Sequence, residues 1–157
     1  MNRTLTMLLI ALAGSSLSIY AQVPEPHEAA RTYRLEAGFN PDPLTMEYTA
    51  GGSIASQVPG LGDFGYITEL PLLILEYHSD GMFPLHIYLH GDEQSSIIMY
   101  DPAGRWYASG PLYGQNPGIL LDEPLSGEYL LWFGSYRRAA DLAVTLFISE
   151  FRTPRYE

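Results

Sequence analysis

Turn-forming residues recur at short intervals along this chain, and their spacing restricts the folds open to it. Clusters rich in glycine, proline, asparagine and aspartate separate short apolar stretches from Gly38 to the last residues. The spacing is about 8 to 12 residues, which is typical of the strands and turns of a β-sandwich or barrel. Beyond the first 21 residues no stretch has a convincing helical pattern. The sequence therefore predicts an all-β protein.

Residues 126–136 contain a turn signal, an apolar strand and a second break, and the strand is predicted to be central in a sheet. Gly127 breaks the preceding loop, and the side chains after it alternate between the two faces of an extended chain. Both faces are apolar, with Tyr129, Leu131 and Phe133 on one and Leu130 and Trp132 on the other. A strand with two apolar faces is typical of a sheet interior, so the rest of the fold is expected to supply its neighbours.

Further strands are expected before and after this one. They cover residues 44–50, 64–68, 72–77, 84–90, 95–100, 105–107, 119–121 and 141–151. Residues 53–62, rich in glycine, proline and serine, are expected to be a connection. Along residues 84–90 the alternation predicts that Leu85, Ile87 and Leu89 face inward and that His86, Tyr88 and His90 face outward. Together the strands predict a jelly-roll-like antiparallel β-sandwich of about eight or nine strands.

The N-terminus has the features of a secretory signal peptide. One cation, Arg3, precedes an apolar segment that is too short to span a bilayer. Cleavage is expected after Ala21, with Ser18 as the alternative site. The chain then divides into a signal peptide over 1–21, a flexible leader over 22–32, a β-sandwich domain over 33–151 and a tail over 152–157. The protein is predicted to be exported, either to the periplasm or out of the cell.

Charge and composition narrow the possible partners. The chain has 18 acidic side chains against 8 basic ones, and its net charge is -10. Such a balance repels phosphate backbones, which argues against nucleic acid as a partner. No second long apolar run is present, so no membrane span is expected after the signal peptide. Without cysteine, stability must come from packing or from a bound ion.

Residues 97–104, Pro124, residues 126–129 and the final alternating strand follow one another in an order that resembles the bacterial pre-peptidase C-terminal domain. A closer resemblance, over roughly residues 35–150, is to small exported bacterial proteins with that jelly-roll sandwich. It is carried by Gly38-Phe39, Pro41-Asp42-Pro43, Gly51-Gly52, Gly65-Tyr66-Ile67, Trp132, Gly134 and Ser149-Glu150. The resemblance implies a non-catalytic module. Some pre-peptidase domains bind calcium through carboxylates, whereas residues 108–111 here lack the acidic cluster that relatives carry at this place.

Five acidic residues in predicted turns are candidate ligands for a calcium ion: Asp80, Asp92, Glu93, Asp122 and Glu123. Calcium takes six to eight oxygen ligands, several of them carboxylates brought together from loops. The alternative is that these acids are solvated and only add charge. Four residues of strand separate His86 from His90 by about 13 Å, which is too far for both to bind one zinc ion.

The sequence shows no motif for hydrolysis. It lacks Gly-x-Ser-x-Gly, His-Glu-x-x-His and a cysteine nucleophile. A small secreted hydrolase stays an alternative, and it requires a cleft that gathers a histidine, an acid and a serine. Glu76 and Glu128 are the strand acids whose burial would suit acid–base chemistry, if they do not face water. We expect no enzymatic activity.

Aromatic residues provide the candidate binding site. Trp106, Tyr107 and Tyr113 flank a predicted flexible loop, and Tyr136 ends the central strand. Exposed rings of this kind stack on sugars or anchor proteins, and the alternative is packing in or around the core. We expect a non-catalytic module for protein interaction or stabilisation, whose partner is an unknown protein or glycan. A calcium-dependent or carbohydrate-binding module is the alternative.

Overall fold

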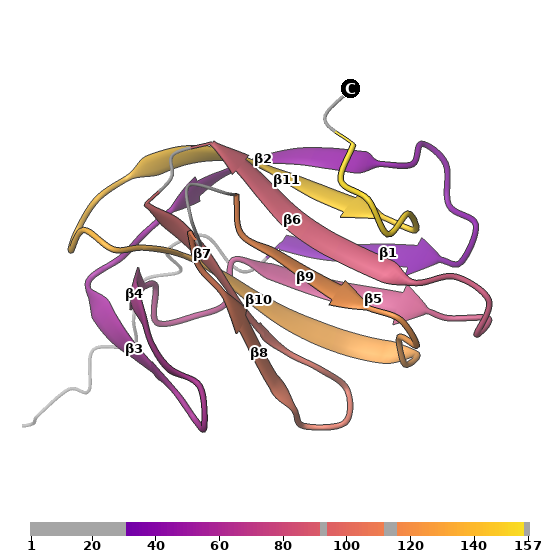
Figure 1. Cartoon of the computed structure of the whole chain (residues 1–157), viewed down its shortest axis with the longest axis horizontal. Helices are drawn as coiled ribbons and strands as arrows, with labels where there is room; N and C mark the ends of the chain where they lie inside the picture. The colour runs from indigo at the N-terminus through magenta and orange to yellow at the C-terminus, as the bar shows by residue number, and fades with distance from the viewer. Residues whose placement is uncertain (1–30, 92–93, 112–115, 156–157) are drawn as a thin grey trace, which may run out of the picture.

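The computed structural model describes residues 31–91, 94–111 and 116–155 and forms two sheets packed face to face (Figure 1). A seven-stranded sheet contains β1 (Arg31–Glu36), β3 (Ile54–Val58), β4 (Gly62–Ile67), β5 (Leu73–His78), β7 (Ser95–Tyr100), β8 (Trp106–Ser109) and β10 (Gly127–Ser135). A four-stranded sheet contains β2 (Leu44–Ala50), β6 (Leu85–Gly91), β9 (Gly118–Leu121) and β11 (Leu142–Ser149). The predicted all-β sandwich is confirmed, and the described ranges hold eleven strands where eight or nine were expected.

The predicted signal peptide and residues 22–30 of the predicted leader lie outside the described residues. The last two residues of that leader, Arg31 and Thr32, belong to β1. This strand pairs with β5 in parallel, so the sandwich is not antiparallel throughout. Within the described ranges, no helix is long and apolar enough to cross a membrane.

Strand β10 occupies the centre of the seven-stranded sheet, as its two apolar faces predicted. It pairs antiparallel with β5 through residues 127–131 and with β7 through residues 130–135, and Ser135 pairs with β4. The inward side chains of Tyr129, Leu131 and Phe133 are fully buried. Its outward residues, Leu130 and Trp132, are only half-buried, so one face of this strand lies in the core and the other near the surface.

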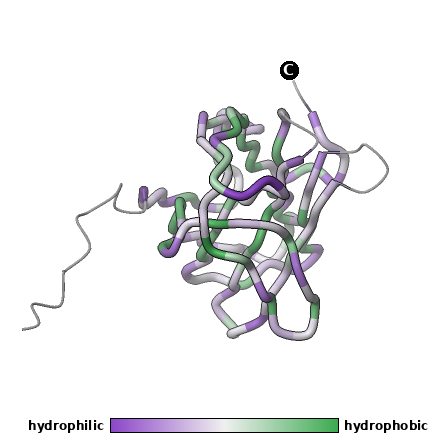
Figure 2. The backbone as a smooth tube through the Cα atoms, turned by 90° about the vertical axis from the view of Figure 1, so that its left-hand side faces the viewer, coloured by the Kyte–Doolittle hydropathy of each residue, from purple (hydrophilic) through white to green (hydrophobic). Residues whose placement is uncertain are grey.

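Inward side chains of both sheets form the main core. The Tyr48 ring of β2 meets the Phe133 ring of β10 edge to face, with centroids 4.9 Å apart. The Tyr129 hydroxyl donates a hydrogen bond to the Leu125 carbonyl at 2.7 Å, which ties the loop before β10 to the strand. Burial raises the pKa of Tyr129 to about 12. Figure 2 shows hydrophobic and hydrophilic segments alternating along the chain through this body.

The β3–β4 hairpin corrects one prediction. Residues 53–62 were expected to be a connection, but β3 lies inside them and pairs antiparallel with β4. The pairing shifts register between Ala55 and Gln57, and the buried Ser56 hydroxyl accepts a hydrogen bond from the Phe64 N–H at 3.0 Å. A short strand with an irregularity, flanked by glycine and proline, gives little periodic signal in the sequence.

The outer face of the four-stranded sheet is covered by the C-terminal end of the chain. His86 and Tyr88 were expected to face solvent, yet they are only 7% and 1% exposed. The Tyr88 ring stacks on Phe147 at 5.0 Å. Its hydroxyl donates to the Arg155 carbonyl at 2.6 Å and accepts from the Arg155 N–H at 2.8 Å. Alternation correctly placed His86 and Tyr88 on the outer face, but the segment that covers them comes from residues far along the sequence. His90 is exposed as expected.

Candidate functional site

Strand pairing gathers aromatic side chains on the outer face of the seven-stranded sheet. Leu130 of β10 pairs with Tyr100 of β7, which pairs with Trp106 of β8, and Trp132 pairs with Ile98 in the next row. The Trp106 ring centroid lies 4.7 Å from that of Tyr100 and 5.8 Å from that of Trp132. We call these five residues the aromatic band. It contains both tryptophans of the chain.

A hollow of about 230 Å³ lies between this band and the β3–β4 hairpin. The hairpin contributes Gln57, Val58, Pro59 and Ile67, and the band contributes Ile98 and both tryptophans. The buried Ser96 hydroxyl of β7 donates to the Phe64 carbonyl of β4 at 2.7 Å and fastens the hairpin to the sheet. Val58 and Ile98 are buried here, outside the main core, so the outer face has a small apolar cluster of its own.

The turn between β7 and β8 holds the aromatic band in position through Asp101. The backbone closes with the Gly104 N–H donating to the Asp101 carbonyl at 2.9 Å, as the predicted turn requires. The Asp101 carboxylate accepts the N–H groups of Ala103 and Arg105 at 2.9 and 2.8 Å and the Arg105 guanidinium at 2.7 Å. The Tyr107 hydroxyl also donates to it, at 3.3 Å.

Burial alone would raise the pKa of Asp101, but the hydrogen bonds from Arg105 and Ala103 and the positive charge of Arg105 outweigh burial. The pKa of Asp101 therefore lies below its ordinary range. Because Tyr100 precedes this turn and Trp106 follows it, an ionised Asp101 keeps the two rings in register.

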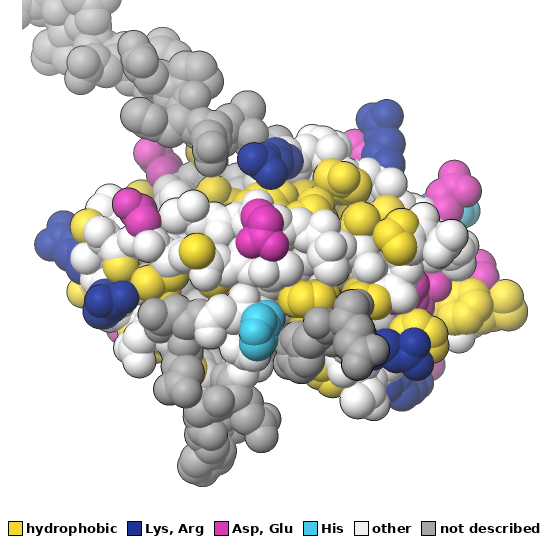
Figure 3. Space-filling model, turned by 90° about the horizontal axis from the view of Figure 1, so that it is seen from above, with side chains coloured by type: hydrophobic (Ala, Val, Ile, Leu, Met, Phe, Trp, Pro, Cys, Tyr) yellow, Lys and Arg dark blue, Asp and Glu magenta, His cyan; other side chains and the backbone are white. Residues whose placement is uncertain are grey.

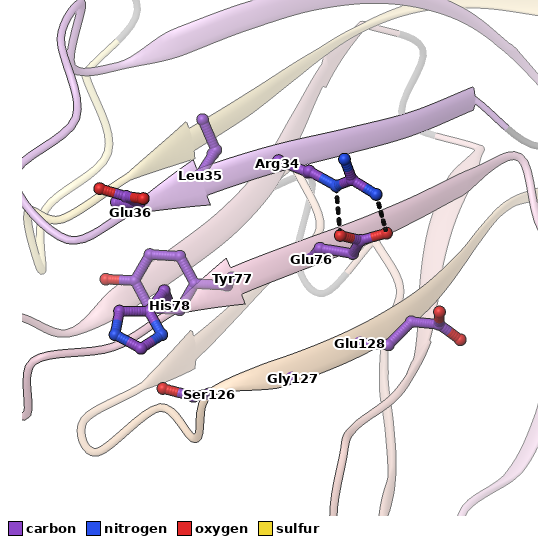
Figure 4. Close-up of a pocket in the computed structure, with 9 residues that line it drawn as sticks. All are labelled: Arg34, Leu35, Glu36, Glu76, Tyr77, His78, Ser126, Gly127 and Glu128. Carbon is purple, nitrogen blue, oxygen red and sulfur yellow. Dashed lines mark hydrogen bonds and ion pairs between the residues drawn. The ribbon is translucent and has the colours of Figure 1, made fainter.

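An acidic area continues the same outer face towards β1 and β5 (Figure 4). Register places Arg34, Glu76 and Glu128 side by side on β1, β5 and β10. The Arg34 guanidinium donates to the Glu76 carboxylate at 2.5 and 3.4 Å, whereas Glu128 points away from this pair and forms no hydrogen bond or ion pair with a described residue. The shallow pocket here has a volume of about 510 Å³ and is also lined by Glu36 and His78.

This second pocket gathers the residue types that a hydrolase needs, but their geometry does not form a catalytic set. Glu36, His78 and Ser126 all line it. The Ser126 hydroxyl accepts a hydrogen bond from the Ser79 N–H at 2.9 Å and donates its proton to the Ser79 carbonyl at 3.3 Å. That proton is directed at a backbone oxygen and not at His78, so the nucleophile and base contact of a hydrolase is missing among these residues.

The four aromatic residues singled out from the sequence lie in different places. Trp106 belongs to the aromatic band, while Tyr107, its neighbour on β8, points the opposite way and packs against the main core. Tyr136 follows β10 and its hydroxyl lies against Gly110, beyond the end of β8. Tyr113 lies outside the described residues. Tyr100 and Trp132 were missed as site residues, although the turn at residues 101–104 already implied that Tyr100 faces Trp106.

The candidate calcium ligands are not brought together where the structure describes them. The Asp80 carboxylate accepts the Met82 N–H at 2.9 Å, and Asp122 forms an ion pair with Arg152. Asp92 and Glu93 lie outside the described residues. In the described ranges no three histidine or acidic side chains form a group able to hold a metal ion, so Glu123 does not belong to such a group either. Acidic side chains in Figure 3 lie mostly singly among hydrophobic and uncharged groups.

Comparisons with known proteins give distant structural likeness alone. No family model matches the chain, and no curated protein matches it. Among solved structures, the Aeromonas hydrophila PliG, a periplasmic lysozyme inhibitor of g-type lysozyme, aligns with a TM-score of 0.39 and 12% identity, over 77% of this chain and 98% of that one. Similarity this low does not transfer an activity. The resemblance to pre-peptidase C-terminal domains has no support from a family model and stays a prediction.

Proposed function

We propose that this protein is an exported, non-catalytic β-sandwich module that binds another protein through the outer face of its seven-stranded sheet. The observation that carries the proposal is the aromatic band beside the β3–β4 hollow. Both tryptophans and Tyr100 are concentrated there on a surface that the chain leaves half open. Tryptophan and tyrosine are enriched among the residues that contribute most to protein binding.

The ring geometry favours a protein over a glycan. Sugars stack best on flat aromatic surfaces, but the Trp106 plane is tilted by 37° from that of Trp132 and by 50° from that of Tyr100. The three rings therefore form an uneven surface with a hollow beside it, which suits a protruding side chain. A flat sugar chain stacked on all three rings at once would need them to lie nearer to one plane.

Site-specific photo-cross-linking tests this proposal. A photoreactive amino acid replaces Gln57, an exposed residue on the wall of the hollow, and the protein is incubated with the envelope fraction of its source cell. Glu47, exposed on β2 of the other sheet, is the control position. We expect a discrete cross-linked protein from position 57 and none from position 47.

The substitution Trp106→Leu should reduce the cross-linking yield by at least about tenfold, because loss of an aromatic anchor costs about 2 kcal/mol or more. Leucine retains apolar volume on β8, and circular dichroism is the check that the variant folds. Leu120→Ala, at an exposed apolar residue of β9, is the matched control and should leave the yield unchanged. Equal cross-linking from both positions, or no effect of Trp106→Leu, would refute the proposal.

A further inference from the structure

We infer that the segment bound on this outer face is cationic and extended, with arginine or lysine side chains alternating with apolar ones. The inference rests on the proposed function and specifies the chemistry of its partner. Two independent features of the face lead to it: an excess of carboxylates at one end and half-exposed indole rings at the other.

The first feature is the charge of the face. Glu128 lies two residues before Leu130 on β10, so its side chain projects on the same side as the aromatic band. Three carboxylates line the neighbouring pocket, those of Glu36, Glu76 and Glu128, against the single guanidinium of Arg34. That guanidinium is already bound to Glu76. The described part of the face therefore has a surplus of negative charge that its own side chains do not neutralise.

The second feature is the aromatic band itself. A cation over the face of a tryptophan is attracted by the ring, and the attraction grows as water is excluded. The nearest arginine in sequence, Arg105, does not supply that cation, because its guanidinium binds Asp101 and lies 5.8 Å from the Tyr107 ring centroid on the other side of β8. The carboxylates at one end of the face and the indole rings at the other thus both favour a cationic partner side chain.

The dimensions fit a short extended segment. From β1 to β8 the face crosses four strand spacings, or about 19 Å at about 4.8 Å each. A segment of about six extended residues covers that width, with every second side chain directed at the sheet. The net charge of -10 adds long-range attraction for a basic protein.

Two synthetic peptides test the inference on the full protein: acetyl-(Arg-Leu)₃-amide and its charge-reversed counterpart, acetyl-(Glu-Leu)₃-amide. Neither contains tryptophan, and both tryptophans of the protein lie in the aromatic band, so intrinsic fluorescence reports on this face alone. We expect the arginine peptide to change the emission and to bind at least about tenfold more tightly than the glutamate peptide at low salt.

Substitution locates the effect. Glu128→Arg should weaken binding of the arginine peptide by about fivefold to tenfold, and the difference should shrink at high salt because exposed charges are screened. Glu47→Arg, at an exposed acid of the other sheet, is the matched control and should change the affinity by less than about twofold. Equal affinity for the two peptides, binding of neither, or indifference to Glu128→Arg would overturn the inference.

The two proposals can fail separately. Cross-linking at Gln57 that depends on Trp106, combined with equal binding of the two peptides or with binding of neither, would leave the proposed function standing and refute the cationic partner. Absence of position-dependent cross-linking would refute the proposed function itself.

Discussion

The carboxylate of Asp101 should stabilise the protein far more than its arginine partner does. The Asp101 side chain is 1% exposed, whereas that of Arg105 is 57% exposed. In Asp101→Asn the amide oxygen can still accept the N–H groups of Ala103 and Arg105. The new NH₂ group, however, faces the Arg105 guanidinium and the Tyr107 hydroxyl, where the second carboxylate oxygen had accepted hydrogen bonds.

These contacts determine how much each substitution should lower the free energy of unfolding. Loss of charge-assisted hydrogen bonds at a buried site lowers the free energy of unfolding by about 2 to 3 kcal/mol. The substitution Arg105→Gln removes only a largely exposed ion pair and should cost about 0.5 to 1 kcal/mol. In a protein of this size about 2 to 3 kcal/mol corresponds to a drop in Tm of about 5 to 10 °C.

Urea unfolding followed by tryptophan fluorescence measures both variants, and Trp106 lies directly after the turn that Asp101 holds. The pH dependence is a second readout. The pKa of Asp101 lies below its ordinary value, so its contribution is present above about pH 4 and is lost as the pH falls through the folded-state pKa. Equal costs for Asp101→Asn and Arg105→Gln, or a cost below about 1 kcal/mol for the first, would refute this reasoning.

Burial lowers the pKa of His86 despite its contact with the Phe151 carbonyl, so on acidification the imidazole is protonated in the unfolded chain before it is in the folded one. The free energy of unfolding should therefore fall by up to about 1.4 kcal/mol per pH unit below pH ~6.5. Thermal melts of His86→Gln should lack this pH dependence, while those of His90→Gln should keep it. Tyr88→Phe removes the hydroxyl that binds both backbone groups of Arg155, so it should lower the free energy of unfolding by about 1 to 2 kcal/mol and speed amide hydrogen exchange at Arg155. Unchanged exchange protection at Arg155 would contradict the contact. Calcium should leave Tm unchanged relative to chelator, because Asp122 is paired with Arg152 and the described residues provide no three-ligand group; a rise on the order of 10 °C would indicate a site.

The sequence predicted those parts of the fold that local alternation determines. Two apolar faces identified β10 as a central strand, and the turn at residues 101–104 identified the β7–β8 hairpin. Alternation could not show that β3 pairs with β4, because its signal is short and its register is irregular. Nor could it show that His86 is buried, because the covering residues lie more than sixty positions away.

The candidate site was harder to predict because it depends on three-dimensional pairing. Trp106 was identified from its type and its place beside a loop, but Tyr107 was included with it although successive residues of a strand face opposite ways. Trp132 was noted only as part of the central strand. Its contact with Trp106 requires the registers of β10 with β7 and of β7 with β8, and the sequence does not specify the first of these.

The measurement that most directly tests the account is an NMR map of the protein with the partner isolated by cross-linking. The two indole N–H signals report on Trp106 and Trp132, and the ring signals of Tyr88 and Phe147 report on the opposite sheet. We predict that the partner shifts both indole signals and leaves Tyr88 and Phe147 unchanged. Shifts confined to the four-stranded sheet, with both indole signals unmoved, would contradict the claim that the aromatic band is the binding face.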